Sequence, residues 1–218
     1  MCLASRVPFK QHPIRGNLPR PMLDLDSLEE LLLGGRCTPE QICAELAKIF
    51  GVKCTEVGLL RLEGQLLRFL HPAELQAAGC IPLSSSAVAA KTALTRQAEF
   101  FNNFANVPHR SVFELILLST PGAGSEGDAP LAIQKLMSAP ILGEDGEVLG
   151  VVQVSRKGVT PGAAGPDFLA TDLIKLESVA RRVATLMPEI LHADSKNPRR
   201  KLEFRNEQKQ KPKPSRPR

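Results

Sequence analysis

The stretch SAPIL at residues 138–142, followed by DGEVLGVV at residues 145–152, carries the strongest secondary-structure signal in this chain. Two apolar runs flank an Asp-Gly pair, which favours a β-hairpin because a type I′ turn requires a positive φ at both central residues. The sequence therefore predicts two paired strands between residues 136 and 156.

The sequence also indicates four helices, the first of them a short one that carries Leu28, Leu31 and Leu32. Residues 38–41, Thr-Pro-Glu-Gln, can form the capping box of a second helix with proline at its first position, and Gly51 predicts the end of that helix. Serines 84–86 are candidate caps for a third helix. Apolar residues spaced three and four positions apart predict a long final helix over about residues 170–191.

A second hairpin is predicted nearer the N-terminus. Apolar runs at residues 57–62 and 66–70 lie on either side of Gly64-Gln65, which is typical of a tight turn between strands. Residues 98–118 combine a short strand with a segment whose type the pattern leaves open. Residues 122–130 (GAGSEGDAP) are expected to form an exposed loop.

The net charge of +5 is unevenly distributed along the chain. Residues 195–218 contain ten Lys or Arg and two Glu, a net charge of +8, whereas the other 194 residues hold 18 basic and 21 acidic residues, a net charge of −3. The main part of the chain is therefore mildly acidic. This distribution argues against a nucleic-acid-binding domain with a basic face.

The C-terminal segment 193–218 is predicted to be a disordered basic tail, because it has high charge, four prolines and few apolar residues. Such a segment is usually only solvated, but it also suits contact with a polyanion, an anionic membrane or an acidic partner protein. The candidate polyanion contacts are Arg199, Arg200, Lys201, Arg205, Lys209, Lys211 and Lys213.

Several classes of protein are disfavoured. The sequence has no run of about 18 apolar residues, and its start lacks the apolar stretch of a signal peptide. We therefore expect a cytoplasmic protein whose residues 1–22 form an extended, proline-rich arm. The five cysteines, an odd number without a CxxC pair, are expected to be reduced structural thiols.

From about residue 25 to residue 191 the chain resembles the GAF domain family. The resemblance rests on the hairpin at 138–152, on the segment from Phe168 to Leu176, and on the segment from Ile81 to Thr95. It implies an α+β fold with a central antiparallel sheet, the terminal helices on one face and a lid of loops and short helices on the other. The GAF-like domain is then expected to span residues 23–192.

Members of this family bind small molecules such as cyclic nucleotides, tetrapyrroles or metal centres, or simply dimerise. The lid region gathers four phenylalanines with a few polar neighbours, as a mostly apolar ligand pocket would. The candidate ligand-binding residues are Phe100, Phe101, Asn102, Asn103, Phe104, His109, Arg110 and Phe113. The alternative is that the phenylalanines fill a second core under the lid. Because Asn102-Asn103-Phe104 only faintly resembles the cyclic-nucleotide signature of the family, the ligand and any cofactor stay unidentified.

The resemblance also raises an enzymatic alternative, since free methionine sulfoxide reductases share this fold. Their chemistry requires an accessible thiolate of low pKa close to a second thiol. Cys43 falls on a helix face and Cys54 begins a strand, while the expected lid and central hairpin contain no cysteine. We therefore predict no catalysis. His71 and His109 are expected to be structural residues in solvent-facing turns rather than metal ligands, since no second ligand stands at metal-binding spacing.

The final helix has more apolar residues than a single narrow stripe along its surface would hold. One stripe would pack on its own sheet, and a second could meet another copy of the chain. The candidate dimerisation residues are Leu173, Leu176, Val179, Val183 and Leu186.

These expectations combine into one leading hypothesis. The chain is a non-catalytic, GAF-like sensory or regulatory module that binds a small molecule, dimerises, or both, and acts on a partner protein. The alternatives are a free methionine sulfoxide reductase and a polyanion-binding adaptor that acts through the basic tail.

Overall fold

The computed structural model describes residues 28, 30, 37–76, 79–104 and 131–195 of the chain. Its strands are β1 (Val57–Glu63), β2 (Leu66–His71), β3 (Cys80–Pro82), β4 (Glu99–Phe101), β5 (Ile133–Leu142) and β6 (Val148–Lys157). Its helices are α2 (Pro39–Phe50), the 3-10 turn η1 (Cys54–Glu56), α3 (Ala73–Gln76), α4 (Val88–Thr95) and α6 (Ala170–Ser195). The proposed arm at 1–22, the candidate ligand residues His109, Arg110 and Phe113, and the charged tail residues lie outside the described part.

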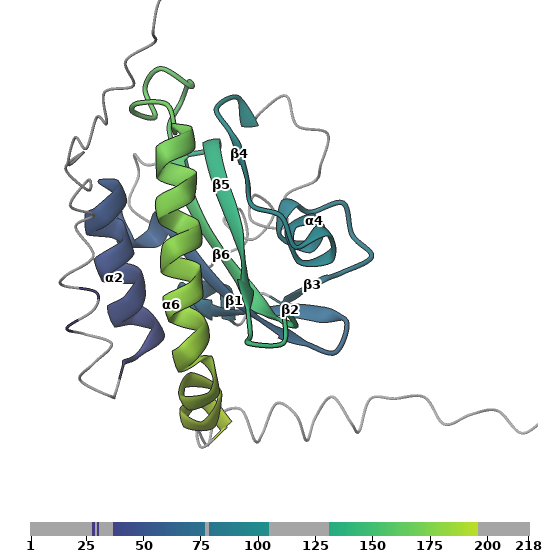
Figure 1. The fold of residues 1–218 in the computed structure, drawn as a ribbon. Helices are drawn as coiled ribbons and strands as arrows, with labels where there is room; N and C mark the ends of the chain where they lie inside the picture. The colour runs from purple at the N-terminus through teal and green to yellow at the C-terminus, as the bar shows by residue number, and fades with distance from the viewer. Residues whose placement is uncertain (1–27, 29, 31–36, 77–78, 105–130, 196–218) are drawn as a thin grey trace, which may run out of the picture.

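The strands form one antiparallel sheet in the order β3-β2-β1-β6-β5-β4 (Figure 1). Both predicted hairpins are present: β1 pairs with β2 around Gly64, and β5 pairs with β6 from Ile133 opposite Lys157 to Leu142 opposite Val148. The β1–β6 pair then joins the two hairpins at the centre of the sheet.

The turn between β5 and β6 differs from the predicted type I′ turn. Its loop is longer than two residues, because Gly143 N donates to the Glu147 carbonyl and Gly146 N donates to the Gly143 carbonyl. In this turn only Gly146 has a positive φ, of 75°. This geometry corresponds to a type I turn followed by a left-handed residue, so a single glycine is sufficient.

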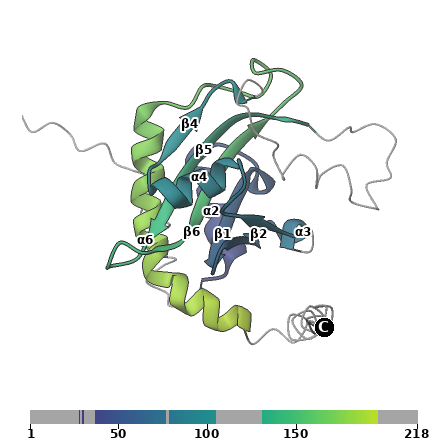
Figure 2. The same cartoon turned by 90° about the vertical axis from the view of Figure 1, so that its right-hand side faces the viewer.

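Helices cover both faces of the sheet, as Figures 1 and 2 show. Helices α2 and α6 pack on one face, over a core that includes Leu46, Val152 and Val183. Helix α4 packs on the other face against β5 and β6, over a smaller core. The predicted α+β architecture, with an antiparallel sheet and the two long helices on one face, is therefore confirmed.

Helix α2 begins and ends where the sequence predicts. Thr38 Oγ1 accepts a hydrogen bond from Gln41 N at 3.3 Å, and Gln41 Oε1 accepts one from Thr38 N at 3.0 Å, which completes the capping box. Gly51 ends the helix in the left-handed region with a φ of 59°. Helix α4 is different, because its N-cap is Ala87 and the predicted serine cap is absent; Ser85 Oγ instead accepts from Ala87 N just before the helix.

Two expectations about α6 are wrong. The helix continues to Ser195, so residues 193–195 belong to it and not to a tail. The apolar residues proposed for dimerisation also face the chain's own core: Leu176, Val179, Val183 and Leu186 are buried there, and Leu173 packs partly against it. The exposed apolar residues at this helix are instead Leu169, just before its first turn, and Ile174.

Candidate functional site

A cluster of three polar side chains lies beneath α4, on the face of the sheet opposite α2 and α6. Thr92 of α4 approaches Ser138 of β5 with 2.8 Å between the two hydroxyl oxygens, and Gln153 Nε2 of β6 donates to Ser138 Oγ at 3.1 Å. Ser138 and Gln153 face each other because they are register partners in the β5–β6 pair. All three side chains are buried.

The hydrogen bonds within this cluster do not use all of its donors. Thr92 and Ser138 each carry one O–H hydrogen, and only one of the two can lie between their oxygens. Thr92 Oγ1 and Gln153 Nε2 both donate to Ser138 Oγ, and no contact among the described residues engages the Ser138 hydroxyl hydrogen. A buried donor without an acceptor is costly, about 1–3 kcal/mol, so this position suits an acceptor atom of a ligand or a water molecule.

The elements that carry the polar cluster also contribute to two apolar clusters. Val88, Leu136 and Phe104 belong to one of them, and Ala93 and Val151 belong to the other. Strand β4 borders this region because it pairs with β5, which places Glu99 opposite Ser138. The α4 side of the sheet therefore combines mostly apolar residues with a few convergent polar groups, the usual composition of a small-molecule site.

The structure describes five of the eight candidate ligand-binding residues. Phe104 is buried and makes an edge-to-face contact with Phe101, whose ring centroid lies 6.4 Å away. Phe101 also lies 5.9 Å from the Lys91 ammonium. Phe100 is 37% exposed, and Asn103 is exposed. The described aromatic residues thus divide between a small core and the surface, which agrees in part with the alternative of a second core.

Asn102 has a structural contact that its sequence neighbourhood does not indicate. Its Nδ2 donates to the Phe168 carbonyl at 2.9 Å, and its Oδ1 accepts from Phe168 N at 2.8 Å. Phe168 is buried just before α6. The amide of Asn102 therefore ties the end of β4 to the beginning of α6.

Replacing Asn102 with alanine is expected to lower the free energy of unfolding by about 1–3 kcal/mol, since the half-buried backbone groups of Phe168 lose both partners. Asn103→Ala provides a matched control on an exposed side chain, and we expect it to change stability by less than about 0.5 kcal/mol. Urea denaturation followed by circular dichroism measures both. Equal stability of the two variants would contradict a structural role for Asn102.

Two of the thiols, those of Cys43 and Cys54, lie with the core on the face of the sheet opposite the α4-side cluster. Cys43 is buried in the core beneath α2, and burial raises its pKa well above the ordinary range. Burial also raises the pKa of Cys54, and the nearby carboxylates of Glu40 and Glu74 raise it further. Raised pKa values disfavour the thiolate that a reductase requires.

His71 differs from the expected solvent-facing residue, because it is buried. Its Nε2 lies 3.4 Å from Cys54 Sγ and 3.2 Å from the Cys54 carbonyl oxygen. This contact joins the end of β2 to η1. Within the described residues, no group of three or more His, Cys, Asp or Glu side chains is arranged to hold a metal ion.

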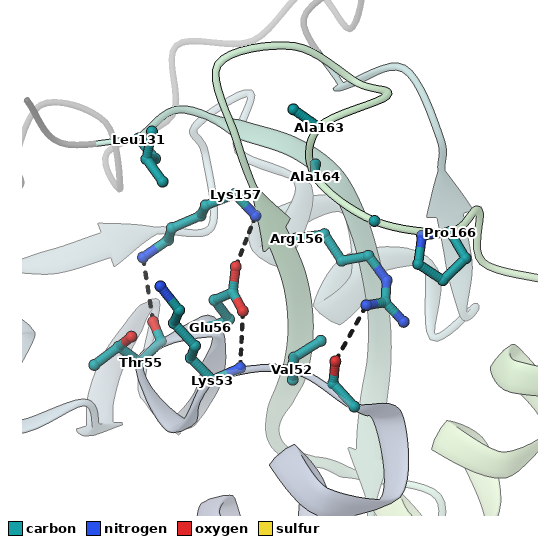
Figure 3. Close-up of a pocket in the computed structure, with 12 residues that line it drawn as sticks. Val52, Lys53, Thr55, Glu56, Leu131, Arg156, Lys157, Ala163, Ala164 and Pro166 are labelled. Carbon is teal, nitrogen blue, oxygen red and sulfur yellow. Dashed lines mark hydrogen bonds between the residues drawn. The ribbon is translucent and has the colours of Figure 1, made fainter.

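A cavity of about 770 Å³ lies at a different place, beside the C-terminal end of α2 (Figure 3). One wall comes from residues 51–56 and the other from β6 and the loop before α6. Its ionisable lining consists of Lys53, Arg156 and Lys157 with a single carboxylate, Glu56. We refer to it as the basic cavity.

Sequence reasoning missed the residues of both sites. Thr92, Ser138 and Gln153 come from three separate elements, and no spacing in the sequence brings them together. A serine at a strand position in the SAPIL stretch was an available signal, because a polar residue in an otherwise apolar strand is either paired or functional. For the basic cavity, the adjacent bases Arg156 and Lys157 at the end of an apolar strand were the corresponding signal.

Comparisons with known proteins identify the fold. No protein-family model matches the sequence, and no curated protein matches it. Among solved structures, the GAF domain from Acinetobacter phosphoenolpyruvate-protein phosphotransferase is similar with a TM-score of 0.53 and 14% identity, over 79% of this chain and 95% of that one. The free methionine-R-sulfoxide reductase from Neisseria meningitidis, solved in complex with its substrate, is similar with a TM-score of 0.50 and 16% identity, over 78% of this chain and 89% of that one.

These likenesses establish that the chain has a GAF-like domain. Because a reductase shares the fold, the fold alone does not decide between a sensory module and an enzyme. None of the helices in the described ranges is long and apolar enough to cross a bilayer.

Proposed function

We propose that this chain is a non-catalytic sensory or regulatory module that binds a small molecule on the α4 side of its sheet. The observation that carries the proposal is the buried polar cluster of Thr92, Ser138 and Gln153, in which no described residue accepts from the Ser138 hydroxyl. A ligand with a carbonyl, carboxylate or ring-nitrogen acceptor would satisfy it. Phe101 and Phe104 would supply apolar contact.

The thiol positions favour this proposal over a reductase. A reductase of this fold would bring an ionised thiol to its substrate, whereas Cys43 and Cys54 pack with the core on the α2 and α6 face of the sheet. Their raised pKa values oppose ionisation at neutral pH. The third possibility, a polyanion-binding adaptor, depends only on the net charge of +8 in residues 195–218.

A thermal-shift screen of the full chain tests the proposal with a panel of cyclic and linear purine nucleotides, free amino acids, haem and methionine-R-sulfoxide. We expect a compound that raises the Tm of the unchanged chain to lose that effect in Thr92→Val. The control is Thr95→Val, on the same helix, because Thr95 is exposed and donates only to the Lys91 carbonyl. We expect Thr95→Val to keep the full shift.

The same screen discriminates the enzymatic alternative when methionine formation from the sulfoxide is measured in the presence of dithiothreitol. We expect no turnover above the protein-free rate. Turnover that Cys54→Ser or Cys43→Ser abolishes would replace our proposal with the reductase. A Tm shift that is equal in Thr92→Val and Thr95→Val would place the ligand elsewhere.

The same proposal includes a homodimer that signals ligand binding to a partner protein. Any such dimer would use the outward face of α6 near Leu169 and Ile174, because the stripe that the sequence predicts for dimerisation is occupied by the chain's own core. These two side chains are more than half exposed.

A further inference from the structure

The basic cavity carries an unbalanced positive charge. Three cationic side chains, Lys53, Arg156 and Lys157, and one carboxylate line it, which leaves a net charge of +2. The carboxylate of Glu56 is already engaged, since its Oε2 accepts from Lys53 N at 2.8 Å and its Oε1 accepts from Lys157 N at 2.7 Å. Glu56 therefore organises the backbone at the cavity through its two carboxylate oxygens.

The two ammonium groups are available to a ligand. Lys53 is exposed, and its Nζ has no hydrogen-bond partner among the described residues. Lys157 Nζ donates to the Thr55 carbonyl, at 3.2 Å, which leaves two of its three hydrogens for other acceptors. In Figure 3 both side chains reach toward the same side of the cavity. Burial lowers the pKa of Lys157, and the neighbouring Lys53 lowers it further against the opposing effect of Glu56.

Arg156 has a different role. Its NH2 donates to the Phe50 carbonyl at 2.9 Å and its NH1 to the Gly51 carbonyl at 3.3 Å, so the guanidinium binds the C-terminal end of α2. The same group lies 4.9 Å from the centroid of the Phe168 ring. Both terminal nitrogens of the guanidinium thus donate to carbonyls at the end of α2, and the side chain adds positive charge to the cavity. The ammonium groups of Lys53 and Lys157 are therefore the groups that would bind an anionic ligand, each as a point charge.

Part of the cavity lining is apolar, and the cavity is roomy. Leu131, Ala163, Ala164 and Pro166 contribute to its lining, and a volume of about 770 Å³ is in the range of small-molecule sites. A phosphate monoester carries a charge of about −1.5 to −2 near neutral pH, which balances the excess better than a single carboxylate. We propose that the basic cavity binds a phosphate monoester of a small organic molecule, with Lys53 and Lys157 on the phosphate and the body of the molecule against the apolar wall.

The proposed site is independent of the α4-side ligand. It lies beside α2 and the loop before α6, and no residue of the Thr92 cluster contributes to it. Loss of binding at one site therefore leaves the other to be measured separately.

Titration of the full chain with phenyl phosphate by calorimetry, at fixed ionic strength, tests the proposal. We expect the double variant Lys53→Gln with Lys157→Gln to bind about tenfold or more weakly, because two charge-assisted contacts are lost. The control, Lys211→Gln with Lys213→Gln, removes the same charge from the basic C-terminal sequence, and we expect it to change affinity less than about twofold. Since Lys157 is half-buried, Lys53→Glu on an exposed side chain provides a second variant with the same expected loss.

Each outcome decides the proposal. Equal weakening in the two double variants, or no binding to the unchanged chain, would overturn it. Benzoate that binds as tightly as phenyl phosphate would overturn the preference for phosphate. Inorganic phosphate weaker than phenyl phosphate supports the apolar wall, whereas equal or tighter binding of inorganic phosphate would overturn the assignment to an organic ester.

Discussion

Gly150→Ala is expected to lower the free energy of unfolding by about 3 kcal/mol or more, enough to unfold most of a marginally stable chain. Gly150 lies in β6, where it pairs with Arg61 of β1 and Ile141 of β5. A Cβ at this position would lie 2.1 Å from the Leu60 carbonyl oxygen and 3.2 Å from Arg61 Cα. Both are backbone atoms of the central strand pair, so relief requires the two strands to separate.

Urea denaturation followed by circular dichroism measures this loss. Gly162→Ala is a matched control, because a Cβ added there would have no atom within 4 Å and the φ of Gly162 is not in the left-handed region. We expect that variant to stay within about 0.5 kcal/mol of the unchanged chain. A loss below about 1 kcal/mol in Gly150→Ala would show that β1 and β6 can separate at little cost.

Val179→Asp is expected to abolish cooperative unfolding or to yield insoluble protein. Val179 is 0% exposed and packs with Leu46 and Val152 in the core between α6, α2 and the sheet. An unpaired carboxylate in such surroundings costs several kcal/mol, which is comparable to the whole stability of a domain. If Val179 belonged to a dimer interface, the same change would instead give a folded monomer in place of the dimer.

Ile174→Asp is the control for this variant, since it also places aspartate at a β-branched position of α6. Ile174 is 57% exposed, so we expect a folded protein with stability within about 0.5 kcal/mol of the unchanged chain. Circular dichroism and light scattering distinguish the outcomes. A native spectrum with halved mass in Val179→Asp would contradict the buried position, and halved mass in Ile174→Asp would support a dimer through the outward face of α6.

The elements that sequence reasoning predicted correctly have local causes. The capping box of Thr38 and Gln41 uses side chains three residues apart, and the Gly51 terminus requires one residue with a positive φ. The two hairpins follow from apolar runs around Gly64 and Gly146. The GAF-like arrangement of these elements was accessible because the hairpin and final-helix motifs lie in order along the chain.

The features that the sequence does not reveal concern contacts between distant residues. Asn102 reaches Phe168, 66 positions away, and no local pattern distinguishes such an amide from a ligand contact. The apolar positions of α6 extend around its surface because the helix packs on β5 and beside α2, so a broad apolar face resembled two stripes. The polar pair of Thr92 and Ser138 is brought together only by the docking of α4 on β5.

Phe168, just before α6, is held by two side chains. The Asn102 amide, at the end of β4, hydrogen-bonds its backbone, and the Arg156 guanidinium lies over its ring. Beyond this point, α6 continues for 18 residues from Ala170 to Met187 before Pro188 interrupts its hydrogen bonding. At 1.5 Å per residue this part of the helix is about 27 Å long. A tilt of about 3° at Phe168 would move its far end by about 1.4 Å. A tilt of α6 about Phe168 would therefore displace the opposite end of the helix more than the end near β4 and the basic cavity.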